Sequence, residues 1–490
     1  MVRFRVKSFS ICALLLSLAF LSCRCPGQAA PAAPEGSWQG TLDAGSAKLR
    51  LVLTITKSGG EYKGILESVD QGATIPAEKV TVNGDKLRAD FPRVNGFYEG
   101  TLNKQGTEIA GSWTQNGGTL PLAFKRAEST KAVATKDDSK ATPAEKAFTS
   151  PIDVTIPLAP TAFQANGKTH LVYELHIVNF SAQNTVLTQI AILSDTGAEL
   201  GRMEQTELLS NTMPVGNRDA LGMDKLNLGG GASVVVFMWV TVDGSAKVPA
   251  ALEHKITVKV GKNQDELSVL GARTVVSRDI AVIGAPLRGD NWEAANGPSS
   301  TSAHRRAIIP IEGKAVIAQR FAIDWVRLNP DGKSFTGDPK DNKNYRAYGS
   351  EALAVADGVV TEVKDGIPEN VPGINSRAVP ITLETVGGNH VILDIGHGRY
   401  GFYAHMQPGS LKVKLGDHVK GGQVLGLVGN SGNSTEPHLH FHLSNANSPL
   451  GSEGIPYALE SFETKGKADA PPVKHKLEIP TEAEIVTFEK

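Results

Sequence analysis

Cysteine is almost absent from this 490-residue chain, and its three copies, Cys12, Cys23 and Cys25, all lie in the first 25 residues. The rest of the chain therefore has no internal disulfide and no thiol chemistry. Aromatic residues make up only 6% of the sequence, whereas glycine is frequent at 51 residues. This composition favours many short strands and turns over long helices. Neither charge sign dominates, with 50 basic against 51 acidic residues, so we expect no nucleic-acid partner.

The N-terminus has the pattern of an export signal. Arg3, Arg5 and Lys7 precede an apolar run over residues 11–21, which is too short to span a bilayer and is followed by small residues. We expect residues 1–30 to be a signal peptide and the protein to be exported to the periplasm or cell envelope. The stretch Phe20-Leu-Ser-Cys23 also resembles a lipoprotein box, so a form lipid-anchored through Cys23 is the alternative.

Alternating patterns predict a mainly β protein with three β-rich domains. Residues 35–127 contain successive strand patterns with an Asn83-Gly84 hairpin turn, which predicts a small β-barrel or curled sheet. Residues 128–150 have the composition of a flexible linker. Long strand patterns over 151–285 predict an immunoglobulin-like sandwich without a disulfide. The third domain is expected over 286–465, followed by a C-terminal tail over 466–490.

The third region contains most of the twelve histidines, and three of them stand in one short strand pattern, His438-Leu-His440-Phe-His442-Leu443. Alternation of this kind predicts a strand with an imidazole face and an apolar face. Side chains two residues apart on a strand lie roughly 6–7 Å apart along the chain. Neighbouring imidazoles on that face are close enough to share one metal ion.

Four upstream segments accompany this strand in a recognisable order. They are Phe321-Ala-Ile-Asp324-Trp-Val, Ala354-Val-Ala-Asp-Gly-Val-Val, Phe402-Tyr-Ala-His405-Met and Gly416-Asp-His-Val-Lys-Gly-Gly-Gln-Val-Leu-Gly. Together they resemble the lysostaphin-type (LytM-type) zinc endopeptidases, over about 150–175 residues at the C-terminal end of the chain. The resemblance implies an antiparallel-sheet peptidase domain that holds one zinc ion and cleaves the peptide crosslinks of peptidoglycan.

The resemblance also implies roles for individual residues. Zinc ligands in that family are the His and Asp of an H-x-x-x-D motif and the second His of H-x-H, which correspond here to Asp324 and His440. The two remaining family histidines correspond to His405 and His438, which would orient the attacking water and stabilise the oxyanion. These two are the predicted catalytic residues.

One family ligand is missing, because Arg320 occupies the first position of H-x-x-x-D. Arginine stays protonated and cannot bind zinc. His442 could replace it, since strand periodicity places it beside His440, and we predict Asp324, His440 and His442 as the metal ligands. His304 could instead fold back to the site, and loss of zinc is the third alternative.

The sequence leaves three candidate functions, two from the ligand alternatives and one from a separate resemblance. The first is an exported zinc metalloendopeptidase acting on peptidoglycan crosslinks. The second is a catalytically degenerate envelope protein that binds wall peptide or activates another wall hydrolase. The third is a lipoyl- or biotinyl-type carrier, which two of the segments also resemble, but the interval around His405 lacks the lysine such a hairpin needs. The zinc content of the protein separates the first two.

Overall fold

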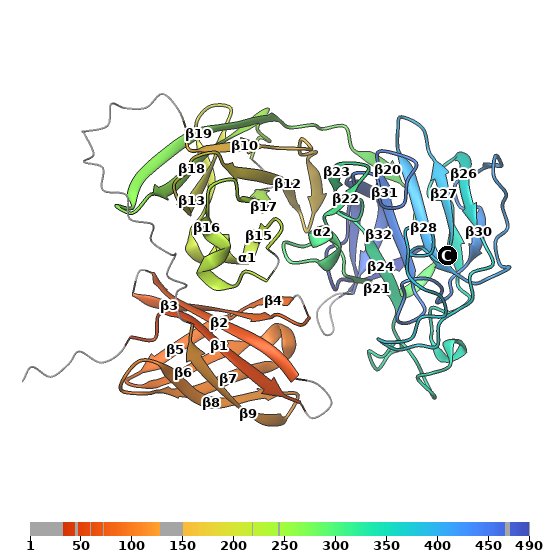
Figure 1. Ribbon diagram of the computed structural model, residues 1–490. Coiled ribbons are helices and arrows are strands. Elements are labelled where there is room, and N and C mark those ends of the chain that lie inside the picture. The colour runs from red at the N-terminus through yellow and green to blue at the C-terminus, as the bar shows by residue number, and fades with distance from the viewer. Residues whose placement is uncertain are drawn as a thin grey trace, which may run out of the picture.

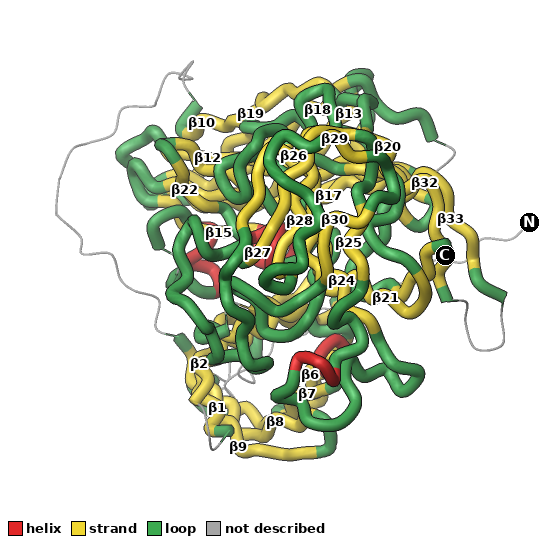
Figure 2. The backbone as a smooth tube through the Cα atoms, turned by 90° about the vertical axis from the view of Figure 1, so that its right-hand side faces the viewer, coloured by secondary structure: helices red, strands yellow, loops and turns green. Residues whose placement is uncertain are grey.

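The computed structural model describes residues 33–44, 48–58, 60–71, 73–127, 150–217, 219–243, 246–465 and 471–489. The predicted signal peptide, the three cysteines and residues 128–149 of the predicted linker lie outside these ranges. Strands and loops form nearly all of the described backbone (Figure 2), which confirms the mainly β class. Among the described helices, none is both long enough and apolar enough to cross a membrane.

The first unit is a closed sheet, called the barrel below, at the lower left of Figure 1. Its strand order is β2-β1-β9-β8-β7-β6-β5-β3-β4, and β2 also pairs with β3, so the sheet closes on itself. Trp38, Tyr98 and Phe124 fill the interior and are fully buried. The strands are β1 (Gly36–Asp43), β2 (Lys48–Ser58), β3 (Glu61–Ser68), β4 (Ala73–Pro76), β5 (Lys79–Asn83), β6 (Lys86–Phe91), β7 (Gly96–Leu102), β8 (Glu108–Gln115) and β9 (Gly118–Arg126), with a 3-10 turn at Pro92–Val94.

The second unit, called the sandwich, consists of two sheets that share one apolar core. Leu171 and Leu175 of one sheet pack in the same cluster as Ile190 and Ile256 of the other. One sheet contains β10 (Ile152–Thr155), β11 (Phe163–Ala165), β12 (Lys168–Asn179), β15 (Thr212–Pro214) and β17 (Ser233–Val242). The other contains β13 (Thr185–Ser194), β14 (Glu199–Met203), β16 (Asn227–Leu228), β18 (Ala251–Val260) and β19 (Asp265–Val275). Helix α1 (Gln205–Asn211) and a 3-10 turn (Gly222–Leu226) connect them.

The third unit, called the C-terminal unit, is built on one large sheet with the path β20-β32-β34-β21-β24-β31-β28-β27-β26-β29, with β33 paired to β32. Leu439, Phe441 and Leu443 are fully buried on its core side. Burying each such side chain stabilises the folded state by about 1.5–3 kcal/mol. The strands are β20 (Ala281–Ile283), β21 (Gly289–Ala295), β24 (Ile323–Arg327), β26 (Gly358–Lys364), β27 (Asn389–Asp394), β28 (Tyr400–Met406), β29 (His418–Val419), β31 (Leu439–Ser444), β32 (Tyr457–Thr464), β33 (Val473–Glu478) and β34 (Ile485–Phe488).

Smaller elements complete the C-terminal unit. The most important for the site is helix α2 (Ala303–Arg306), which lies between the sandwich and the large sheet (Figure 1). Two further sheets have two strands each. β22 (Ile309–Ile311) pairs with β23 (Lys314–Val316), and β25 (Glu351–Leu353) pairs with β30 (Val424–Leu427). A 3-10 turn covers Asn342–Asn344.

The large sheet extends past both boundaries expected for the third domain. β20 precedes residue 286, and the segment expected to be a tail after 466 contributes β33 and β34. Val486 and Phe488 of β34 are buried in the same core as Trp325, because β34 pairs with β21 inside the sheet. A fragment over 286–465 would therefore expose part of this core.

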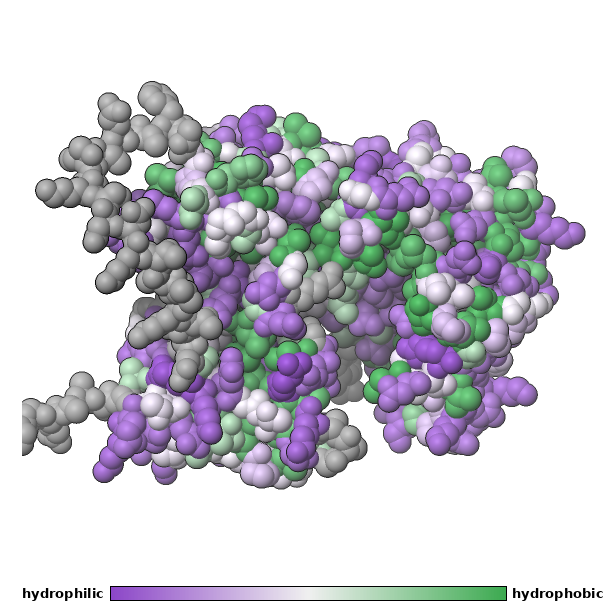
Figure 3. Space-filling model, viewed as in Figure 1, coloured by the Kyte–Doolittle hydropathy of each residue, from purple (hydrophilic) through white to green (hydrophobic). Residues whose placement is uncertain are grey.

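The sandwich and the C-terminal unit also share apolar packing. Phe163 of β11 belongs to the core of the C-terminal unit and meets Phe321 edge-on, with ring centroids 5.4 Å apart. Val235 and Phe237 of β17 form a second buried cluster with Ile308 and Ile317. Hydrophobic surface extends across the centre of the face shown in Figure 3, where these two units meet.

Candidate active site

The register between β24 and β31 places the predicted acid beside the predicted histidine. Asp324 is the cross-strand partner of His440, and such partners project to the same face of the sheet. The Nδ1 atom of His440 lies 2.8 Å from Oδ1 of Asp324. Both side chains are buried, at 9% and 3% exposure. Burial opposes the charge on Asp324, but His304 and His438 hold its pKa well below the ordinary value.

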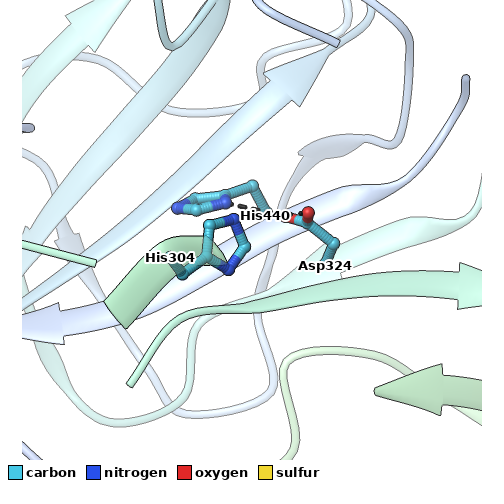
Figure 4. Close-up of side chains that lie close together, drawn as sticks. All are labelled: His304, Asp324 and His440. Atoms are coloured by element: carbon cyan, nitrogen blue, oxygen red, sulfur yellow. Dashed lines mark hydrogen bonds and ion pairs between the residues drawn. The ribbon is translucent and has the colours of Figure 1, made fainter. Parts of the chain in front are cut away.

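A second nitrogen beside Asp324 comes from His304 on α2. Its Nε2 atom lies 3.3 Å from Oδ2 of Asp324, and its ring meets the His440 ring edge-on with centroids 4.9 Å apart. One ligand atom from each of His304, Asp324 and His440 lies within 4.8 Å of the others. Figure 4 shows the three side chains converging from a short helix and two strands.

Two imidazoles and one carboxylate form a donor set that suits catalytic zinc, which takes three protein ligands and keeps one position open. The neighbouring residues also fit, because metal ligands are normally oriented by outer hydrogen bonds. Nε2 of His440 lies 3.0 Å from Nδ1 of His442, and the Asn296 side-chain amide donates to Oδ2 of Asp324 at 2.8 Å. His304, Asp324 and His440 would hold the ion.

His405 and His438, the predicted catalytic residues, lie next to this group. Their ring centroids are 4.9 Å apart, and the His405 ring is 5.8 Å from that of His440. Nδ1 of His405 lies 2.8 Å from the Ser431 carbonyl oxygen, so this nitrogen donates and Nε2 is left as an acceptor. His405 also adopts a left-handed backbone conformation with φ of 66°, a strain typical of functional positions.

The surroundings shift the pKa values of His405 and His438 in opposite directions. Burial, together with the charges of His438 and His440, holds the pKa of His405 well below its ordinary value. Burial also opposes a charge on His438, but Asp324 raises the pKa of that imidazole. Nε2 of His438 lies 3.3 Å from Oδ1 of Asp324, and its Nδ1 lies 2.8 Å from the Glu436 carbonyl oxygen. Such opposed shifts suit one proton acceptor and one proton donor.

His442, the predicted third ligand, is not in the group around Asp324. It follows His440 on the same strand face but contacts the Nε2 side of that ring, whereas Asp324 contacts Nδ1. The two nitrogens of an imidazole point in different directions, so an ion bound at Nδ1 of His440, beside Asp324, would lie away from His442. The ligand role of His442 stays a prediction that this geometry does not favour, and His442 sits instead as an outer partner of His440.

Arg320 points away from the site and is buried between two glutamates. Its guanidinium lies 2.9 Å from Oε2 of Glu174, in the sandwich, and 2.7 Å from Oε2 of Glu453. It also donates to the Gly454 carbonyl oxygen at 2.9 Å. Burial opposes its charge, yet these carboxylates raise the pKa of Arg320 above its ordinary value. The residue at the missing ligand position is therefore part of the contact between the two units.

The site opens into a cavity of about 340 Å³. His304, Asp324, His405, His438 and His440 all line it, together with Arg377 and Phe402. Sequence reasoning ranked His304 below His442 and did not find Asn296. The only sequence signal for His304 is that a histidine precedes the motif. The 19 residues between His304 and Asp324 have no regular spacing that would place the two together.

Comparison with known proteins covers the part of the chain that carries His405, His438 and His440. Residues 344–451 match peptidase family M23, so this part of the chain is a peptidase M23 domain. Endolysin 2638A of Staphylococcus phage 2638A is 29% identical over 137 residues, covering 25% of this chain and 28% of the relative. Peptidoglycan DD-endopeptidase ShyA of Vibrio cholerae is 28% identical over 182 residues, covering 35% of this chain and 36% of the relative. The chain thus spans about a third or less of these relatives' lengths.

A solved structure, the catalytic domain of lysostaphin from Staphylococcus simulans, is also similar. It is 23% identical, and the match covers 34% of this chain and 86% of that domain with a TM-score of 0.18.

Proposed function

We propose that this chain, whose residues 344–451 form a peptidase M23 domain, is an exported zinc endopeptidase that hydrolyses peptide crosslinks of peptidoglycan. The observation that carries the proposal is the group of two imidazoles and one carboxylate, His304, Asp324 and His440, within 4.8 Å of one another. This donor set supports a zinc site despite Arg320. The similarity to endopeptidases that act on peptidoglycan supports the substrate class.

The arrangement suits hydrolysis of an amide bond. Zinc, when bound, supplies a Lewis acid that polarises the scissile carbonyl and favours ionisation of water. His405, with Nδ1 donating to Ser431, presents Nε2 to accept the proton of the attacking water. As the C–O bond forms, His438 donates a hydrogen bond to the developing oxyanion. As the C–N bond breaks, His405 passes the proton taken from the water to the leaving amine.

The experiment uses the exported chain without residues 1–30. We expect about one zinc per chain by metal analysis and new amine ends when the protein is incubated with purified peptidoglycan. His405→Ala and His438→Ala should retain zinc but lower the rate by about 10²–10⁴-fold, as loss of a proton-transfer group does. The exposed His418 of β29 provides the matched control, and His418→Ala should leave both readouts unchanged.

The competing function, a degenerate envelope protein that binds wall peptide or activates another wall hydrolase, is favoured by one observation, the arginine at position 320. It predicts a chain that stays free of zinc after incubation with the metal and releases no amine ends. That result would overturn the peptidase proposal. Full turnover by His405→Ala or His438→Ala would overturn the role given to that residue.

A further inference from the structure

Helix α2 contacts the candidate zinc site and the sandwich with consecutive residues. His304 faces Asp324, whereas Arg305 is completely buried against the sandwich. Successive helical residues point about 100° apart, so one turn can serve two surfaces. The position of the His304 ring therefore depends on how the next residue is held.

Arg305 is held by the backbone of two sandwich strands. Its Nη2 atom donates to the carbonyl oxygens of Tyr173 in β12, at 3.2 Å, and Met238 in β17, at 2.6 Å. The guanidinium also lies 5.5 Å from the ring centroid of Phe237 and 5.7 Å from that of Trp239. These contacts lock α2 onto the sandwich.

Glu174 of β12 lies close to both Arg305 and Arg320, and Glu453 supplies a second carboxylate for Arg320. Its Oε1 lies 3.6 Å from Nε of Arg305, and its Oε2 lies 2.9 Å from Nη2 of Arg320. All three side chains are buried. Unpaired charges in such surroundings are costly, so this arrangement is stable only while the sandwich is docked on the C-terminal unit.

We propose that docking of the sandwich completes the zinc site, with Glu174 and Arg305 as positioning residues that hold His304 beside Asp324. This rests on the zinc site of the proposed function. The sandwich then controls how many ligands the site offers. When docked, the site has three ligands, whereas a shifted α2 leaves only Asp324 and His440. Because coupling between two equilibria is reciprocal, zinc must in turn strengthen the docking.

The first test measures zinc affinity by chelator competition on the chain without residues 1–30. Glu174→Gln should weaken zinc binding by at least about tenfold, the lower end for loss of an outer partner of a metal site. The control is Glu199→Gln, an exposed glutamate of the same sandwich that pairs with Arg202, which should leave the affinity unchanged. Arg305→Lys, which keeps the charge but not the two carbonyl contacts, should also weaken binding.

A double-mutant cycle shows whether the effect passes through His304. In a His304→Ala background, Glu174→Gln should have no further effect on zinc affinity, since the ligand it positions is gone. The same fold loss in both backgrounds, or unchanged affinity in Glu174→Gln alone, would overturn the coupling while leaving the zinc peptidase intact. A parent chain that binds no zinc would overturn both proposals.

The second test needs no substitution, and so it holds even if Glu174→Gln fails to fold. Hydrogen exchange of the parent is compared with and without zinc. Zinc should slow exchange of amides in β12 and β17, which hold Arg305, as well as in β24 and β31. Strand β8 of the barrel is the internal control and should not change. Slowing confined to β24 and β31 would overturn the coupling.

Discussion

Two segments lie next to Asp324: the residues just before β24, which include Arg320, and helix α2, which carries His304. The expected positions of the histidine and the arginine are reversed between them. The approach to β24 carries Arg320, four residues before Asp324, where the family motif has a ligand, and uses it to pair with Glu174 and Glu453. Helix α2 carries His304, which lies 3.3 Å from Asp324. The comparison shows that a histidine from outside the motif can lie beside the carboxylate, and metal binding depends on where such nitrogen atoms lie. Spacing along the chain is only one way to bring them there.

Because the histidine comes from α2, its position depends on contacts between α2 and the sandwich. A histidine at position 320 would belong to the same strand connection as Asp324. His304 instead lies beside Arg305, which the sandwich holds through Tyr173 and Met238. The same sandwich residue, Glu174, contacts both segments. Helix α2 and the segment before β24 are therefore linked through β12 of the sandwich.

The largest effect is expected from restoring the family residue with Arg320→His. A shorter and mostly neutral imidazole would leave Glu174 and Glu453 poorly compensated, and removing one partner of a buried ion pair costs about 3–5 kcal/mol. We therefore expect lower stability in urea unfolding, although the sequence motif alone predicts stronger zinc binding. Arg202→His, at an exposed arginine paired with Glu199, should change stability by less than about 1 kcal/mol. Unchanged stability of Arg320→His would contradict the buried role.

The next effect concerns zinc affinity when the helical ligand is removed. His304→Ala should weaken binding by about 100-fold or more, above the range of roughly 10–100-fold typical of outer partners, because a direct ligand is lost. Its isothermal titration is compared with that of His418→Ala, which removes an exposed imidazole from the same unit. Parent-like affinity in His304→Ala would show that α2 does not supply a ligand.

The smallest effect is expected at His442. Its Nδ1 atom contacts Nε2 of His440, so His442→Ala should disturb the orientation of a ligand and weaken zinc binding by about tenfold. The measurement is the same titration, with His304→Ala as the reference. A larger loss in His442→Ala than in His304→Ala would restore the ligand set predicted from the strand pattern and reverse the comparison.

Local patterns were sufficient for the strand that carries the histidines. Residues alternate with period two on any strand, so His438, His440 and His442 were placed on one face and Leu439, Phe441 and Leu443 in the core, as observed. The motif around Asp324 identified the acid, and register then brought it beside His440. The extent of the large sheet was missed, because β20, β33 and β34 join it from outside the segments that resemble the family.

The sequence by itself determined the mainly β class, the imidazole face of β31 and the family of the C-terminal segment, because these are properties of neighbouring residues and short spacings. Only the tertiary structure brought a third candidate ligand beside Asp324 and gave Arg320 its buried partners. His304 reaches Asp324 only because α2 packs between two units, and Arg320 meets Glu174 across 146 positions of sequence. The free energy of burying a charge depends on which partners surround it, and no local pattern contains that information.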